Sequence, residues 1–323
     1  MISDINILIL SCGTRNKIIQ YFKNELGNKG KVFATDSSPL APALYEADKH
    51  FIVPRINAPD YVDKILEICR KNNISGVLSL IDPELSILSK YKEKFLAIGT
   101  TPIVSNHEII ERSFDKYNFN QFLEDNNFNS MKCYINIKEF YEDLDNNIID
   151  FPVFVKPVDG SASININKVN SREELELLFS RFDNLMIQEY MNGSEYGVDV
   201  FIDLISNEIV SVFIKEKLKM RAGETDKSLS IKNGKILELV RNFVKKAGYQ
   251  GIIDIDIFES NGEYYISEVN PRFGGGYPHA YEVGVNVPKQ IINNLENKIN
   301  EGRLNNYKEN TYMLKYNEVF IKK

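Results

Sequence analysis

The sequence contains no tryptophan, only 3 histidines and only 3 cysteines. Cys12, Cys69 and Cys133 are odd in number, lie far apart in the chain and form no CxxC pair. This spacing gives no basis for a disulfide framework or for a zinc site. We therefore expect a protein whose thiols stay reduced, as in the cytoplasm.

Long hydrophobic runs and an excess of positive charge are also missing. No apolar run reaches the roughly 20 residues that cross a bilayer, and the N-terminus lacks the basic and then apolar segments of a secretory leader. Lysine and arginine number 39 against 45 acidic residues, which gives a net charge of -6. Neither a membrane nor a nucleic acid is expected as a partner, although a local basic pocket for a small phosphate ligand stays open.

The two common glycine-rich nucleotide loops are absent as well. Gly13 stands alone where a dinucleotide-binding fingerprint needs three glycines. Gly27 and Gly30 are too close together for a Walker A loop, and Val32 replaces the hydroxyl residue that would contact magnesium. NAD binding and P-loop chemistry are therefore not expected.

The first third of the chain alternates between strand and helix patterns. Ile5–Leu10 is a short aliphatic run, and a helical stretch with Ile18, Ile19 and Phe22 on one face follows it. Further elements are expected as strands over Lys31–Thr35 and Gly76–Leu80 and as helices over Tyr61–Arg70 and Pro83–Tyr91. This order predicts an α/β domain with a parallel sheet over residues 1–104.

The remainder, residues 105–323, predicts an α+β region whose strands are mostly antiparallel. One amphipathic helix is expected over Glu111–Phe128, and a hairpin turns at Asn261-Gly262. The other expected helices are Arg172–Phe179 and Lys235–Ala247, and the expected strands are Phe151–Lys156, Leu185–Tyr190, Tyr196–Leu204, Ile209–Lys215, Ile252–Phe258 and Tyr264–Val269.

The hairpin at its end carries a candidate magnesium site. Alternate side chains of a strand share a face, so Glu268 and Asn270 point the same way, and Asp256 on the paired strand can join them. Carboxylate and amide oxygens are the ligands that Mg²⁺ prefers. Such residues also occur on solvated hairpins. Arg272 and the glycines at 274–276 favour the functional interpretation, because they add a phosphate-binding fork and a backbone that can lie close to it.

Two further segments fit a nucleotide, although each is also compatible with an ordinary turn. Lys156 ends a strand, and the Gly160–Ser163 loop can present backbone N–H groups and hydroxyls to phosphates. The apolar strand that ends near Glu189 enters a short connector that can offer its backbone to an adenine edge. Glu195, just beyond it, can accept both ribose hydroxyls.

These three elements, in this order, resemble the ATP-grasp superfamily, most closely the single-unit relatives of the carbamoyl-phosphate synthase large subunit and biotin carboxylase. The stretch Asp36–Leu44, with Ala47-Asp48 and Val53-Pro54 after it, is similar to the pre-ATP-grasp domain of that group. The resemblance implies a Rossmann-like pre-ATP-grasp domain over 1–104 and an ATP-grasp domain over 105–323. Two lobes, at about 112–190 and 191–323, would grip ATP.

Residue by residue, the resemblance implies a complete ATP and metal site. The implied ATP contacts are Lys116 and Lys156 at the phosphates, Gly160, Ser161, Ala162 and Ser163 in the lid loop, Glu189, Tyr190 and Met191 at adenine, and Glu195 at ribose. Asp256, Glu268 and Asn270 would bind Mg²⁺, with Mn²⁺ as an alternative, and Arg272 and Lys156 would be catalytic. Two departures from the family pattern leave alternatives open. The lid loop contains little glycine, so it can be stiffer than in relatives. The first metal position is an aspartate, Asp256, so the site can hold one metal firmly rather than two.

The implied activity is that of a cytoplasmic carboxylate–amine ligase that forms an acyl phosphate and releases ADP. The small acid and amine would meet Lys215, Arg221, Glu224, Arg272 and His279. Residues 215–228 can equally be a solvated loop between strands, and a lone histidine is usually a surface residue. The length leaves no room for a second ATP-grasp unit. Two other functions stay open: a carboxylate or carbamate kinase that works with a partner, and a nucleotide-binding regulator without turnover. A homodimer stays open as well.

Overall fold

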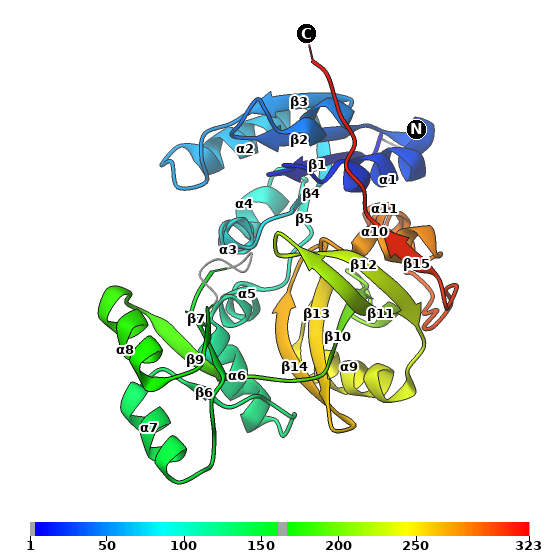
Figure 1. The fold of residues 1–323 in the computed structure, drawn as a ribbon. Coiled ribbons are helices and arrows are strands. Elements are labelled where there is room, and N and C mark those ends of the chain that lie inside the picture. Colours follow the sequence, from blue (N-terminus) through cyan, green and yellow to red (C-terminus); the bar gives the residue numbers. More distant parts are fainter. Residues whose placement is uncertain (1–3, 161–166, 323) are drawn as a thin grey trace.

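The structure is a computed structural model that describes residues 4–160 and 167–322. An N-terminal α/β domain lies at one end of the molecule, and a large lobe with a long antiparallel sheet packs beneath it (Figure 1). A small lobe, over residues 133–189, stands to one side of the large lobe. No helix in the described ranges is long and apolar enough to cross a bilayer.

The N-terminal domain is built on a five-stranded sheet in the order β3-β2-β1-β4-β5, and all of its strand pairs are parallel. The central strand is buried on both faces, because α1 packs on one side while α2 and α3 pack on the other. Its elements are β1 (Asn6–Leu10), α1 (Asn16–Leu26), η1 (Gly27–Lys29), β2 (Val32–Asp36), η2 (Pro42–Glu46), β3 (Lys49–Ile52), α2 (Tyr61–Lys71), β4 (Ile74–Ser79), α3 (Asp82–Lys90), α4 (Lys92–Leu96) and β5 (Thr101–Pro102).

Two helices, α5 (His107–Phe114) and α6 (Lys116–Asp125), connect this domain to the small lobe. The expectation of one helix over Glu111–Phe128 is therefore wrong. Asp115 interrupts the helical run, because its backbone is extended (φ -89°, ψ 103°) and its side chain accepts a hydrogen bond from the backbone N–H of Asn118. This is an N-cap, and it starts a new helix rather than continuing the old one.

The small lobe is a four-stranded antiparallel sheet in the order β6-β9-β7-β8, covered by two helices. Phe140, Val155 and Ile187 lie in a hydrophobic cluster formed by this lobe alone. Its elements are β6 (Cys133–Tyr134), α7 (Ile137–Asp145), β7 (Val153–Pro157), β8 (Asn167–Val169), α8 (Arg172–Arg181) and β9 (Leu185–Glu189).

The large lobe carries a six-stranded antiparallel sheet in the order β14-β13-β10-β11-β12-β15. The β13–β14 turn at Asn261 and Gly262 has positive φ at both residues, as the Asn-Gly signal predicts. Its elements are β10 (Ser194–Ile202), β11 (Ile209–Arg221), β12 (Glu224–Ile231), α9 (Gly234–Ala247), β13 (Gly251–Ser260), β14 (Glu263–Asn270), α10 (Tyr277–Glu282), α11 (Val287–Leu295) and β15 (Tyr312–Leu314).

The stretch 215–228 is a hairpin and not a loop, which corrects the alternative of a solvated connection between strands. Strand β11 continues to Arg221, and β12 starts at Glu224 after the turn Ala222-Gly223, where φ is 50° and 75°. The polar residues are compatible with strand structure because the inner ones meet partners of opposite charge.

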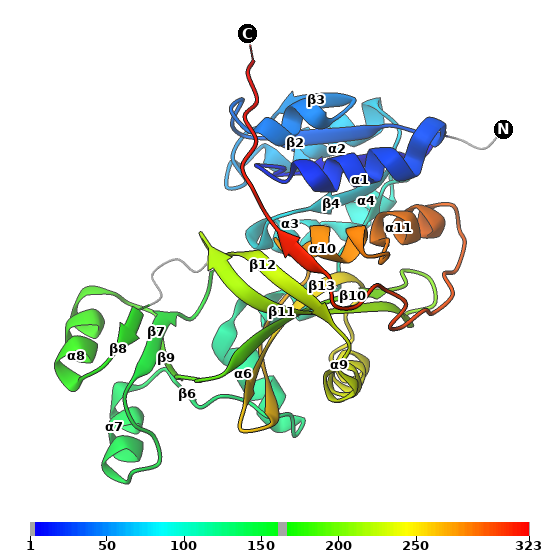
Figure 2. The same ribbon diagram turned by 45° about the vertical axis from the view of Figure 1, so that its right-hand side comes forward.

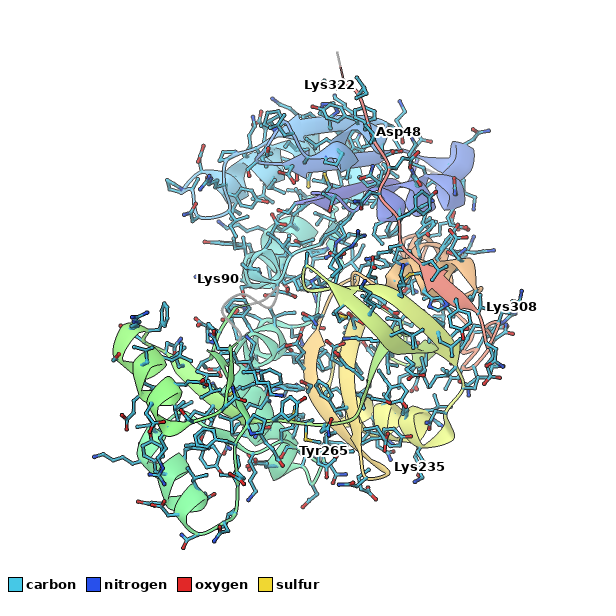
Figure 3. The ribbon with its side chains drawn as sticks, viewed as in Figure 1. Asp48, Lys90, Lys235, Tyr265, Lys308 and Lys322 are labelled. Atoms are coloured by element: carbon cyan, nitrogen blue, oxygen red, sulfur yellow. The ribbon has the colours of Figure 1, made fainter. Side chains whose placement is uncertain are left out.

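The N-terminal domain and the large lobe share one hydrophobic core. Ile7 and Phe22 of the first belong to the same cluster as Phe213, Phe273 and Tyr277 of the second. The chain after β15 then returns to the N-terminal domain (Figures 1 and 2), where the Phe320 ring stacks on Tyr45 at 5.6 Å between centroids. Lys322 lies on the outer side of this domain (Figure 3) and donates to the Tyr45 hydroxyl. The expected fold class, a Rossmann-like domain followed by a two-lobed α+β unit, is confirmed.

Candidate active site

Four oxygen-bearing side chains share one face of the β13–β14 hairpin. Asp256 lies directly opposite Glu268, and Asp254 lies opposite Asn270. Directly paired residues of antiparallel strands project from the same face, so the three predicted metal ligands come together. Asp254 was missed, although its place two residues before Asp256 puts it on that face by strand alternation alone.

A lysine that the sequence analysis did not single out neutralises part of this cluster. Lys217 Nζ lies 2.6 Å from Asp256 Oδ1 and 2.7 Å from Glu195 Oε1, and only 4% of its side chain is exposed. Burial disfavours its charge, but the two carboxylates outweigh burial and raise the pKa of Lys217. Its contact to Asp256 depends on the order of the strands in the sheet, in which β10 lies between β11 and β13.

The electrostatics of the cluster suit a hard cation. Burial, together with the negative charges of Asp254 and Glu268, raises the pKa of Asp256 to about 7 even though Lys217 opposes the shift. No group of three or more His, Cys, Asp or Glu side chains in the described ranges is arranged to hold a metal by itself. The oxygen donors of Asp256, Glu268 and Asn270 nevertheless fit Mg²⁺, which commonly completes its octahedron with water and phosphate oxygens.

Arg272 is fixed at the end of β14 by contacts to both domains. Its Nη2 donates to Asp82 Oδ2 at 2.8 Å and to Asn270 Oδ1 at 2.9 Å. Asp82, at the first turn of α3, was missed. The available signal was an acid shortly after β4, which ends at Ser79, because sites form at the carboxyl ends of parallel strands. Beside it, Gly274 passes so close to Asp254 that an added Cβ would lie 2.1 Å from its Oδ2.

The phosphate candidates lie where the small lobe meets α6. Lys116 is the first residue of α6, and its Nζ donates to the carbonyl of Gly160 at 2.5 Å. Burial and the positive charge of Lys156 lower the pKa of Lys116, while Glu268 across the site opposes this. Lys156 lies buried on β7. Residues 161–166, which include Ser161, Ala162 and Ser163, lie outside the described residues.

The adenine candidates occupy the connection between the two lobes. Glu189 ends β9, and its backbone N–H donates to the carbonyl of Lys132 at 2.9 Å. The Tyr190 ring packs against Phe154 at 5.3 Å and lies under Lys168 Nζ at 3.9 Å. Met191 follows in the connector. Glu195, the ribose candidate, lies at the start of β10 and shares Lys217 with the metal candidates, as described above.

Two of the predicted substrate residues are enclosed in the large lobe. Lys215 is 1% exposed, and its Nζ lies 2.6 Å from Asp199 Oδ2 and 3.5 Å from Asp254 Oδ1. His279 is also buried, and its Nδ1 lies 2.8 Å from Ser228 Oγ. Their contacts brace β10, β12 and β13 beneath the site.

Besides Arg272, described above, two more of the predicted substrate residues lie at the tip of the β11–β12 hairpin. Arg221 is paired with Asp226 at 2.9 Å, and about half of its side chain is exposed. Glu224 is contacted by Arg15 at 2.8 Å and by Lys315 at 3.0 Å. Arg15, from the start of α1, is a further residue that sequence reasoning missed.

Family models match both the N-terminal domain and the region that contains the candidate site. Residues 113–276, about half of the chain, match the model of the ATP-grasp domain. The chain belongs to the ATP-grasp family. Residues 7–103 match the N-terminal domain of PylC-like proteins. The expectation of an ATP-grasp enzyme of the ADP-forming ligase class, related to the carbamoyl-phosphate synthase large subunit, is confirmed at the level of the family.

Two relatives differ in total length, and this chain therefore covers different shares of them. Carbamoyl-phosphate synthase of Methanobrevibacter smithii is 24% identical over 85% of this chain and 76% of that protein. The carbamoyl phosphate synthase large chain of Clostridium botulinum (strain Eklund 17B) is 25% identical over 84% of this chain, but the chain spans only 30% of that protein.

Solved structures share the fold at low identity. The biotin carboxylase domain of Hydrogenobacter thermophilus 2-oxoglutarate carboxylase, solved as a dimer with MgADP, has a TM-score of 0.76 and 16% identity, covering 95% of this chain and 73% of that one. The L-amino acid ligase of Bacillus licheniformis has a TM-score of 0.70 and 18% identity, covering 91% of this chain and 75% of that one.

Proposed function

We propose that this ATP-grasp protein joins a small carboxylic acid to an amine through an acyl phosphate and releases ADP and phosphate. The observation that carries the proposal is the opposition of two charge groups across one site. Asp256, Glu268 and Asn270 lie on the β13–β14 hairpin of the large lobe. Lys116, at the start of α6, is close enough to feel the charges of both Glu268 and Lys156, which lies on β7 of the small lobe. The negative phosphates of a nucleotide match the two lysines, and the positive metal that it carries matches the carboxylates.

The reaction needs no nucleophilic side chain. A carboxylate oxygen of the substrate would attack the γ-phosphorus while the bond from that phosphorus to the ADP oxygen breaks. An amine would then attack the acyl carbon, lose a proton and expel phosphate. Lys156 and Arg272 would balance the charge of the transferring phosphoryl group, and the fixed position of Arg272 between Asp82 and Asn270 keeps this group preorganised.

The metal would be Mg²⁺ in this proposal, held by Asp256, Glu268 and Asn270. When bound, it would neutralise phosphate charge and orient the phosphates for in-line attack. Lys217 shares Asp256 with the metal position. This contact engages Oδ1 of Asp256, and it therefore favours a single metal at Asp256, Glu268 and Asn270 over two equally held metals.

Named relatives support a ligase acting on amino acids. D-alanine–D-alanine ligase of Francisella philomiragia is 32% identical over 139 residues, which cover 39% of this chain and 46% of that protein. The carbamoyl-phosphate synthases among the relatives favour a second candidate, a carboxylate or carbamate kinase that works with a partner. A homodimer, the cytoplasmic location and the domain division at residue 104 stay predictions.

Substrate-dependent ADP release tests the proposal. We expect the purified full chain with Mg-ATP to release ADP only when an acid and an amine from an amino-acid pool are both present. Release with bicarbonate alone would instead support the kinase. Nucleotide binding without release in any pool would contradict both enzymes and support a regulator.

Replacing Glu268 by glutamine tests the metal position. The change keeps the size of the side chain but removes one of the metal's negative ligands, so we expect turnover to fall by about a hundredfold or more with little loss of stability. Glu263→Gln is the matched control, because Glu263 is exposed at the other end of the same strand. Equal turnover in the two variants would remove Glu268 from the site.

A further inference from the structure

An ion-pair cluster between the two domains forms the wall of the site next to Arg272. Arg15 precedes α1, Glu224 begins β12 and Lys315 follows β15. The Glu224 carboxylate is shared, with Oε1 at 2.8 Å from Arg15 Nη2 and Oε2 at 3.0 Å from Lys315 Nζ. The three side chains are 21%, 37% and 24% exposed in that order, so solvent reaches them.

The cluster lies directly beside the group proposed to hold the transferring phosphoryl. Arg15 Nη1 donates to the carbonyl of Phe273 at 3.2 Å, and Arg272 Nη1 donates to the same carbonyl at 3.1 Å. The two guanidinium groups therefore lie side by side. Gly275 packs onto Glu224, because an added Cβ would lie 2.7 Å from its carboxyl carbon. A ligand at Glu224 would thus also be next to Arg272.

The cations of this wall share their carboxylates. The negative charge of Asp254 acts on both Arg15 and Arg272. Arg272 is paired with Asp82 at 2.8 Å, and Glu224 is paired with both Arg15 and Lys315. Arginine has five N–H donors, and the contacts of Arg15 to Glu224 and Phe273 engage only part of that set. One carboxylate placed between Arg15 and Arg272 would occupy donors on both guanidinium groups.

We propose that Arg15 and Glu224 form the recognition subsite for an α-amino acid, the substrate whose α-carboxylate is activated. This inference rests on the proposed ligase function. The carboxylate lies between Arg15 and Arg272, and the α-ammonium takes the place of Arg15 at Glu224. This exchange opens the ion pair between Arg15 and Glu224. A zwitterion is suited to it, because the carboxylate then pairs with Arg15 and the ammonium pairs with Glu224. Neither side chain is left as a buried charge without a partner.

Calorimetric titration of the full chain tests this subsite without turnover. Each proteinogenic amino acid is titrated in the presence of Mg²⁺ and a non-hydrolysable ATP analogue. The amino acid that binds most tightly is then compared with its N-acetyl derivative and with the amine that lacks the carboxylate. We expect both derivatives to bind at least about tenfold more weakly, because each loses one charge-assisted contact. Binding of no amino acid would overturn the proposal.

Arg15→Gln should weaken amino-acid binding at least about tenfold and leave nucleotide affinity within about twofold. Tyr21→Phe is the matched control, since it removes another bond between the same two parts, from Tyr21 on α1 to Glu282 on α10 at 2.9 Å. Arg303→Gln removes an exposed pair as a second control. Equal weakening by Tyr21→Phe would show that Arg15 only ties the domains together, and the proposal would fail.

Glu224→Gln tests the contact to the α-ammonium separately from the contact to the α-carboxylate. We expect this variant to lose the preference for the free amino acid over its N-acetyl derivative, because the partner of the ammonium has lost its charge. A preserved preference would overturn the role of Glu224. Amino-acid binding that depends on Arg15 but yields no ADP would contradict the ligase alone, whereas ADP release with acids that lack an amino group would contradict the subsite alone.

Discussion

His279 is buried in the large lobe beneath the candidate site, and its pKa is shifted far from the usual value. Its ring is 2% exposed and packs edge-on against Phe213 at 5.0 Å. Burial, aided by the positive charge of Lys215, lowers the pKa of His279 from 6.5 to about 4. The imidazole is therefore neutral at physiological pH, and its Nδ1 is held by the hydroxyl of Ser228.

This depressed pKa predicts a loss of stability in mild acid. Between pH 6.5 and pH 4 the unfolded chain binds a proton at this histidine that the folded chain does not, so the free energy of unfolding falls as the pH falls. We expect the contribution to reach about 3 kcal/mol near pH 4. Denaturant unfolding at several pH values should show a flatter pH dependence for His279→Asn than for the wild type. His50→Asn, at an exposed site, is the control for the loss of a histidine as such.

Strand alternation was enough to place Asp256, Glu268 and Asn270 on one face, because this geometry is local to one hairpin. Lys217 and Arg15 could not be assigned in this way. Lys217 reaches Asp256 only because β10 lies between β11 and β13 in the sheet order. Arg15 meets Glu224 across a domain interface. Contacts that depend on sheet order or domain packing have no signature in the neighbouring sequence.

At the scale of elements, the break between α5 and α6 positions Lys116. The Asp115 cap starts α6, and the backbone N–H of Lys116 donates to the carbonyl of Val158 at 2.9 Å. The first residue of the helix is thereby held against the end of β7, next to Lys156. The hydrophobic spacing continued through this break, so periodicity alone predicted one helix, although an aspartate three residues before an asparagine amide was the local sign of a cap.

Asp115→Ala should therefore affect both the helix and the nucleotide. Loss of the cap costs about 1 kcal/mol of stability, and the freed start of α6 should raise the KM for ATP more than it lowers kcat. Asp115→Asn keeps an oxygen that can accept from Asn118 and should restore both properties. The measurements are urea unfolding and ADP release at varied ATP. A normal KM in the alanine variant would show that Lys116 is positioned without the cap.

At the scale of the whole molecule, the described residues form four hydrophobic clusters, and one of them joins two parts of the chain that are far apart in sequence. The N-terminal domain and the large lobe share one core, although the small lobe separates them in the chain, and the small lobe has a core of its own. Phe22 of α1 packs edge-on against Phe273 of the large lobe at 5.9 Å between ring centroids. Nucleotide binding between the lobes would thus move the small lobe against one larger body.

Hydrogen exchange of two core variants tests this division. Phe140→Ala empties a buried position in the small-lobe cluster, and Phe22→Ala empties one in the shared core, each at a cost of about 3–5 kcal/mol. We expect Phe140→Ala to speed amide exchange in β7 and β9 while β1 and β13 keep their protection, because the two cores open separately. Phe22→Ala should speed exchange in β1 and in β13 together. Adding MgADP should slow exchange most in β7, β9 and the β13–β14 hairpin. Uniform loss of protection in the Phe140 variant would mean that the three parts unfold as one unit, and closure of the small lobe would then need a hinge elsewhere.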